Sequence, residues 1–143
     1  MNIVILKQAT PSTLRDINQL IATLREDKGK TAGTLPQLRS IVSDKNTAVV
    51  VAIDGKRIIG IATLYIVRKF GTITGDIEDV IINEAYRGQG LGEKIMKKLI
   101  AVVRAKKMNS VRLTSRPSRI AANKLYQKLG FKKRETNAYK LVL

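Results

Sequence analysis

The sequence predicts a single mixed α/β domain that spans residues 1–143. Two observations predict this class. Segments rich in β-branched residues alternate with segments whose apolar residues recur at helical spacing. The 143 residues, 44% of them hydrophobic, have the length and composition of one domain with an ordinary core, and they contain no internal repeat, low-complexity tract or linker.

The first half of the chain contains the signals of a strand, two helices and a β-hairpin. Thr10 and Pro11 are typical of a helix cap followed by proline at the first helical position. An Asp-Gly pair between two β-branched runs is typical of a hairpin turn. The predicted elements are a strand at 2–6, a helix from 11 to about 27, a shorter helix at 34–44, and hairpin strands at 47–53 and 58–67.

The second half predicts a strand at 76–83, a glycine-rich turn and a helix. Strict alternation would place Ile77, Asp79 and Ile81 on one face of this strand and Glu78, Val80 and Ile82 on the other. The helix should bury Ile95, Leu99, Val102 and Val103, and end near Lys106 and Lys107. The remaining predicted elements are a strand at 110–115, a helix at 118–129 capped by Ser118 and ended by Gly130, and strands at 131–135 and 138–143.

The residues that are missing restrict the chemistry. The chain has no cysteine and no histidine, which excludes thiolate nucleophiles, disulfides and the commonest general base and metal ligand. Any catalysis must therefore use carboxylates, hydroxyls, amines and backbone N–H groups, and we expect no metal site. No apolar run approaches the roughly 20 residues of a membrane span. We expect a cytoplasmic protein without a membrane partner.

The net charge of +16 is unevenly distributed, because residues 87–143 hold 16 Lys/Arg and only two Asp/Glu. Such a half could serve solubility or attract an anionic ligand or partner. With 4% aromatic residues and no Trp, stacking on single-stranded nucleic acid is disfavoured. We therefore expect no sequence-specific nucleic-acid binding, although a basic, non-catalytic nucleic-acid-binding module stays an alternative function.

The turn "YRGQGLG" at residues 86–92 indicates an anion site at a helix N-terminus. It fits neither a P-loop, which would need Lys-Ser/Thr after its last glycine, nor a dinucleotide fingerprint, whose third glycine is replaced by Glu93. It does fit the pattern Arg-x-x-Gly-x-Gly through Arg87, Gly90 and Gly92. A plain helix cap is the alternative interpretation.

Together with "NKLYQKLGF" at residues 123–131, this turn resembles the GNAT superfamily of acetyl-CoA-dependent N-acetyltransferases. The resemblance extends over nearly the whole chain. It implies a central mixed, mostly antiparallel sheet flanked by helices, with acetyl-CoA as co-substrate and its pyrophosphate on the glycine turn. The implied coenzyme contacts are Val80, Ile81, Ile82, Arg87, Gly88, Gln89, Gly90, Leu91, Gly92, Asn123 and Tyr126.

The resemblance also implies the catalytic pair. Glu78, on the strand that leads into the turn, would accept the amine's proton, and Tyr126 would protonate the leaving thiolate. Asp79 is the lesser candidate for the base. The alternative roles are an ion-paired carboxylate for Glu78 and a core tyrosine for Tyr126. Because no cysteine can form an acyl-enzyme, we expect direct attack by the amine in a ternary complex.

The stretch 75–92 is also similar to glucosamine-6-phosphate N-acetyltransferases, in which the matching Glu lies in the active site. That subfamily typically has an acidic residue near the position of Thr114, where this chain reads "LTSRPS". We expect the primary amine of a small molecule, for which an amino sugar is one candidate, as acceptor; a protein N-terminus or lysine is the alternative. Arg116 and Arg119 could contact an anionic group of the acceptor or the coenzyme. A homodimer is the oligomeric state that the resemblance favours.

Overall fold

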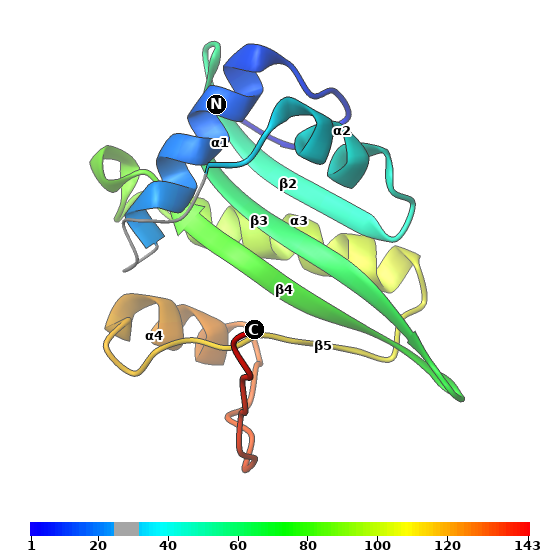
Figure 1. Cartoon of the computed structure of the whole chain (residues 1–143). Coiled ribbons are helices and arrows are strands. Elements are labelled where there is room, and N and C mark those ends of the chain that lie inside the picture. Colours follow the sequence, from blue (N-terminus) through cyan, green and yellow to red (C-terminus); the bar gives the residue numbers. More distant parts are fainter. Residues whose placement is uncertain (25–31) are drawn as a thin grey trace. The chain divides into compact units, whose positions relative to one another are not determined.

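The protein is described by a computed structural model that covers residues 1–24 and 32–143 and divides into two compact units, Met1–Leu113 and Thr114–Leu143 (Figure 1). In the described part of the first unit, five strands form one sheet in the order β1-β2-β3-β4-β5. Strands β1 to β4 pair antiparallel, and β4 and β5 pair parallel. This confirms the predicted mixed, mostly antiparallel sheet. The strands are β1 Asn2–Ile5, β2 Thr47–Asp54, β3 Arg57–Lys69, β4 Thr72–Ile82 and β5 Ser110–Arg112.

Helices cover both faces of this sheet. Helices α1 (Pro11–Leu24) and α2 (Leu35–Ser43) lie on one face, where α1 contacts β3 and β4 and α2 contacts β2 (Figure 1). Helix α3 (Leu91–Ala105) packs on the other face against β2, β3 and β4. All three helices were predicted, α1 and α3 of them from apolar spacing; the predicted end of the first one near residue 27 lies outside the described residues.

The two faces have separate apolar cores. On the α3 side, the predicted residues Ile95, Leu99 and Val103 are buried, whereas Val102 is only partly buried. A Cβ at Gly60 would lie 2.8 Å from both Ile82 Cδ1 and Ile95 Cδ1, so these side chains meet on that face. The core under α1 and α2 consists of Ile17, Leu20, Leu38, Val49, Val51, Ile58, Ile61 and Ile81.

Asp16 of α1 is a buried carboxylate that fixes the hairpin between β2 and β3. Its side chain is 1% exposed. Its Oδ2 accepts a hydrogen bond from the Ile58 backbone N–H at 3.0 Å, and its Oδ1 accepts one from Arg57 Nε at 2.9 Å. Arg57 also donates to Gln19 Oε1 at 3.0 Å. These bonds attach the start of β3 to α1.

We expect Asp16→Ala to lower the free energy of unfolding by about 2–3 kcal/mol, because the buried N–H of Ile58 loses its acceptor and Arg57 its charged partner. Chemical denaturation measures this change. Asp16→Asn, which keeps one acceptor oxygen, should cost less. Equal stability of Asp16→Ala and the parent would show that these bonds add nothing to folding.

The last two predicted strands are wrong, and the strand predicted at 110–115 is shorter. Residues 131–143 have no regular secondary structure, and β5 ends at Arg112. A period-2 pattern becomes a strand only where a neighbouring backbone pairs with it. The described strand pairings do not include residues 131–143, and the apolar side chains of Tyr139, Leu141 and Leu143 are exposed.

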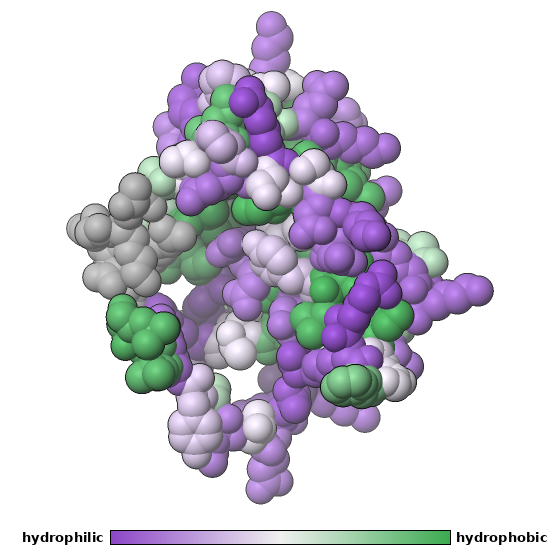
Figure 2. Space-filling view, turned by 45° about the vertical axis from the view of Figure 1, so that its right-hand side comes forward, coloured by the Kyte–Doolittle hydropathy of each residue, from purple (hydrophilic) through white to green (hydrophobic). Residues whose placement is uncertain are grey.

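Basic residues line the outer side of α3. Lys94, Lys97, Lys98 and Arg104 are all exposed, and Lys97 Nζ lies 2.7 Å from Glu93 Oε1. Hydrophilic residues also predominate on the face of the molecule that Figure 2 shows. Among the described helices, none has the length and apolar character that crossing a membrane requires.

Candidate active site

The segment between β4 and α3 is a short 3-10 helix followed by the glycine turn. The 3-10 helix η1 (Glu84–Tyr86) begins after Asn83, whose Oδ1 accepts a hydrogen bond from the Ala85 N–H at 3.0 Å. The chain then passes through Gly88 and Gly90, with φ angles of +76° and +75°. These left-handed conformations suit glycine and are strained for residues with a side chain. Gly88 and Gly90 are therefore required by the backbone path, whereas Gly92 lies within α3 and is not among the left-handed glycines.

Gly90 is the N-cap of α3, and no side chain caps this helix. The first N–H groups of a helix have no intrahelical acceptor, and together with the helix dipole they favour an anion. A Cβ at Gly88 or Gly90 would find no atom within 4 Å, so there is open space beside the turn. The arrangement suits a phosphate group at the N-terminus of α3.

Arg87 adds a positive charge next to this helix end. Its Nε donates a hydrogen bond to the backbone oxygen of Ile82 at 3.3 Å, and its side chain is exposed. The bond holds the guanidinium close to the end of β4. The predicted residues 80–82 and 87–92 thus lie on either side of η1, at the end of β4 and at the start of α3.

A β-bulge interrupts β4 before this stretch. Ile81 pairs with Ile61 and Glu78 with Thr63, so Asp79 and Val80 together lie opposite Ala62. Asp79 has φ of +53°. Bulges of this kind redirect side chains and occur often beside active sites.

The bulge makes the predicted alternation along β4 wrong. Ile77 pairs with Leu64, and Ile81 pairs with Ile61, three residues away on β3, so these two isoleucines point to opposite faces. Glu78 shares the α1/α2 face with Ile81, whereas Ile82 lies on the α3 face beside Gly60. One inserted residue reverses the face of every side chain that follows it.

Glu78 has the electrostatic surroundings of a base. The residue is exposed, yet its pKa is raised above the ordinary value, first by desolvation and then by the negative charges of Asp79 and Asp76. A carboxylate with a raised pKa binds a proton more tightly and is a better acceptor for it. Asp76 itself is paired with Arg112 of β5.

Tyr65 is a neighbour of Glu78 that the sequence interpretation missed. It pairs with Asp76 across β3 and β4 and lies two residues from Thr63, the partner of Glu78, so it shares the face of that carboxylate. Its pKa is raised by burial and by the charges of Asp79 and Glu78. Alternation along the strand predicted at 58–67 indicates which residues share a face with Tyr65, but its place beside Glu78 depends on the register of β3 against β4, which the sequence pattern does not give.

In the second unit, helix α4 (Ile120–Lys128) carries Tyr126, which is 5% exposed. The helix ends at Lys128, and Gly130, which follows the C-cap Leu129, has φ of +96° and turns the chain so that Phe131 meets Tyr126. The two ring centroids lie 6.0 Å apart at 61°, and the Phe131 N–H donates to the Tyr126 carbonyl at 3.0 Å. Burial raises the pKa of Tyr126, and the positive charge of nearby Arg119 partly opposes the rise.

The start of α4 differs from the prediction. Arg119, not Ser118, is the N-cap residue, and no side chain caps the helix. The side-chain amide of Asn123 instead donates to the carbonyls of Arg116 at 2.9 Å and Arg119 at 2.8 Å. Asn123 therefore fixes the loop that enters the helix.

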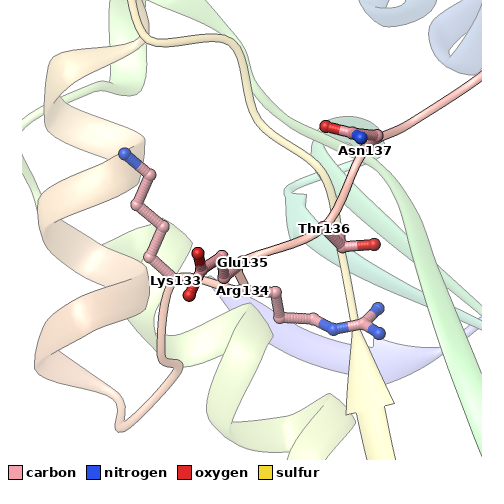
Figure 3. A pocket seen from close by; sticks show the side chains of 5 residues that line it. All are labelled: Lys133, Arg134, Glu135, Thr136 and Asn137. Carbon is pink, nitrogen blue, oxygen red and sulfur yellow. The ribbon is translucent and has the colours of Figure 1, made fainter.

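The site residues are divided between the two compact units. Glu78 and the glycine turn belong to the first unit, whereas Arg116, Arg119, Asn123 and Tyr126 belong to the second. A hollow in the second unit is lined by Lys133, Arg134, Glu135, Thr136 and Asn137, whose side chains extend from one irregular segment (Figure 3). None of these five residues was singled out from the sequence.

The model of the acetyltransferase (GNAT) family matches residues 14–131. The match includes the sheet from β2 onward, the glycine turn and α4. The chain therefore belongs to the acetyltransferase (GNAT) family, a class of N-acetyltransferases. The resemblance inferred from residues 86–92 and 123–131 is confirmed.

Individual relatives are consistent with this membership. The chain is 39% identical over 82 residues to a glucosamine 6-phosphate N-acetyltransferase of Trypanosoma brucei brucei; the match covers 55% of this chain and 54% of the relative, about half of its length. A crystal structure of an acetyltransferase of Trypanosoma brucei is similar with a TM-score of 0.78, 27% identity and 99% coverage of both chains. The glucosamine-6-phosphate N-acetyltransferase of Arabidopsis thaliana reaches a TM-score of 0.80 at 21% identity, with 99% coverage of both chains, and shows the shared fold alone.

Proposed function

We propose that this protein transfers an acetyl group from acetyl-CoA to the primary amine of a small molecule by direct attack in a ternary complex. The observation that carries the proposal is the N-terminus of α3, which lacks a side-chain cap and follows two left-handed glycines at the end of β4. A catalytic candidate, Glu78, precedes this turn on the same strand.

The coenzyme's pyrophosphate would bind the backbone N–H groups of residues 88–92, with Arg87 supplying a positive charge. The open space beside Gly88 and Gly90 supports this fit, because a ligand atom can approach the backbone where a side chain would stand. The pantetheine would run along Val80, Ile81 and Ile82, and one N–H of this strand would polarise the acetyl carbonyl. Asn123, on α4, is the remaining proposed contact.

In the proposed reaction, the neutral amine attacks the thioester carbonyl, the C–N bond forms and the C–S bond breaks. Glu78 takes the proton that the amine loses, directly or through a water molecule. Tyr126 gives its phenolic proton to the leaving thiolate. The raised pKa values of both groups support these roles, since one must bind a proton firmly and the other must stay protonated at neutral pH.

For the acceptor, we propose an amino sugar phosphate. The relative that supports it is the Trypanosoma glucosamine 6-phosphate N-acetyltransferase, to which the matched part of the chain is 39% identical. Arg116 and Arg119 are the candidate contacts for an anionic group of the acceptor or the coenzyme.

The test of the acceptor is release of free thiol from acetyl-CoA with glucosamine 6-phosphate, glucosamine, a diamine and a peptide with a free N-terminus. If thiol release were faster with the peptide than with any small amine, the acceptor would be a protein N-terminus and not a small amine.

The glycine turn gives a direct prediction for the coenzyme. We expect Gly90→Ala to weaken coenzyme A binding by about tenfold or more, equivalent to about 1.4 kcal/mol, because the added Cβ occupies the space that the phosphates need. Titration calorimetry with coenzyme A measures the affinity.

Gly71→Ala is the matched control. Gly71 lies in the turn between β3 and β4 with φ of +74°, close to the +75° of Gly90, and a Cβ there would also meet no atom within 4 Å. Both variants should therefore lose the same stability from backbone strain, and only Gly90→Ala should lose affinity. If Gly90→Ala bound coenzyme A with unchanged affinity, the pyrophosphate would not bind at this turn.

A further inference from the structure

One long-range hydrogen bond attaches the glycine turn to the rest of the sheet. The phenol of Tyr86 donates to Asp54 Oδ2 at 2.8 Å, across 32 residues of sequence. Tyr86 is the last residue of η1, and Arg87 and Gly88 follow it directly. Asp54 is the last residue of β2. Sequence interpretation singled out neither residue.

The other bonds around Tyr86 are mostly local. The Tyr86 N–H donates to the Asn83 carbonyl at 2.9 Å, and the Arg87 N–H donates to the Glu84 carbonyl at 3.3 Å. Further back, the Asn83 N–H donates to the Ile59 carbonyl of β3 at 2.8 Å. The Tyr86 side chain therefore supplies a tertiary bond at the position next to the turn, three residues closer to the glycines than the bond of Asn83.

The Asp54 end of this bond is itself firmly held. Asp54 pairs with Arg57 in the register of β2 and β3. Arg57 donates to the buried carboxylate of Asp16 at 2.9 Å and to Gln19 at 3.0 Å, both on α1. A continuous series of contacts thus leads from α1 through the hairpin end to the glycine turn.

An uncapped turn with two glycines has many accessible conformations, and ordering it on binding costs conformational entropy. A bond that restricts the turn before the ligand arrives lowers this cost. We propose that Tyr86 and Asp54 are positioning residues that hold the glycine turn ready for the coenzyme's pyrophosphate. This inference rests on the proposed function, since it deepens the role of the same turn.

The Tyr86 phenol is suited to stay a donor. Its pKa is raised chiefly because it donates a hydrogen bond to Asp54 and faces that negative charge, while the charge of Arg57 opposes the rise. Ionisation would turn the donor into a negative group facing a carboxylate. The bond with Asp54 therefore persists throughout the neutral range.

The test is Tyr86→Phe, assayed with acetyl-CoA and with acetyl-pantetheine, a donor that lacks the pyrophosphate. We expect KM for acetyl-CoA to rise about three- to tenfold, with kcat at saturating acetyl-CoA close to that of the parent. The kinetic constants for acetyl-pantetheine should stay at parental values. A residue that only stabilised the fold would change both donors alike, and this outcome overturns the inference.

Asp54 supplies the second half of the experiment. Asp54→Ala should raise KM for acetyl-CoA as Tyr86→Phe does, and the double variant should be no worse than either single one, because both remove the same bond. Asp54→Asn keeps an acceptor oxygen and should retain most of the parental KM. Additive effects in the double variant contradict the inference.

Tyr139→Phe is the matched control, because Tyr139 is 89% exposed in the C-terminal segment and should tolerate loss of its hydroxyl without kinetic effect. Failure of the proposed function is distinguishable from failure of this inference. If the parent protein does not use acetyl-CoA, the function is wrong. If the parent uses it and Tyr86→Phe has the parental KM, only the positioning role is wrong.

Discussion

Replacing Tyr126 with phenylalanine should lower turnover by roughly 10²- to 10⁴-fold, the usual cost of losing an acid–base group, while coenzyme A affinity and folding persist. The variant removes only the hydroxyl and keeps the ring, which is packed edge-on against Phe131. Without the phenol, the thiolate must leave unprotonated or take a proton from water. Steady-state kinetics at saturating acetyl-CoA, with coenzyme A binding measured in parallel, test this expectation.

The raised pKa of Tyr126 determines how this comparison depends on pH. A phenol whose folded pKa lies above its unfolded value of 10.0 adds stability that is present below the unfolded pKa and lost as the pH rises through the folded one. The phenol is therefore protonated, and able to act as the acid, from neutral pH to about pH 9. In that range the stability difference between Tyr126→Phe and the parent should stay constant.

If Tyr126→Phe turned over at the parental rate, Tyr126 would have no acid role and would be only a core residue.

Glu78→Gln should leave coenzyme binding intact and reduce the rate most where the acceptor amine is still protonated. At a pH where the amine is protonated, the reduction in rate should be about 10²- to 10⁴-fold, as for other acid–base groups. At higher pH the amine is already neutral, so the deficit should shrink. A pH–rate profile of parent and variant with the same amine measures both features.

The acidic side of the parental profile has its own expected sign. Desolvation and the charges of Asp79 and Asp76 raise the pKa of Glu78 above the ordinary carboxylate value of 4.5. As the pH is lowered, the base should therefore become protonated, and activity should begin to fall, while the pH is still above 4.5. Asp79→Asn is the comparison variant, since asparagine tolerates the left-handed backbone at this position. A deficit in Glu78→Gln that is equal at every pH, or a larger loss in Asp79→Asn, would assign the base elsewhere.

Much of the candidate site was predictable because it depends on short segments. The order of β4, glycine turn and α3 follows from a segment rich in branched apolar residues, an Arg-x-x-Gly-x-Gly pattern and a helix-periodic segment that are adjacent in sequence. The left-handed conformations of Gly88 and Gly90 are likewise a local property that glycine permits. The helix that carries Tyr126, with Gly130 at its end, is encoded in the same local manner.

Other features of the site are long-range. The bond between Tyr86 and Asp54 joins residues 32 positions apart, and the bond between Asp16 and Ile58 joins residues 42 positions apart. No pattern within either segment specifies its distant partner. The proximity of Tyr65 to Glu78 depends in the same way on the register between β3 and β4.

Local sequence was thus sufficient for the order of the elements up to α4, the mixed α/β class and the glycine turn between β4 and α3, because hydrophobic period and glycine placement act within a few residues. Tertiary structure alone decided the bulge at Asp79 and Val80, which places Glu78 and Ile82 on opposite faces. It also decided that residues 131–143 remain irregular, although strands were predicted at 131–135 and 138–143. The physical reason is common to both: the face and the pairing of a strand are set by hydrogen bonds to a neighbouring backbone, and a strand's own residues do not specify that neighbour.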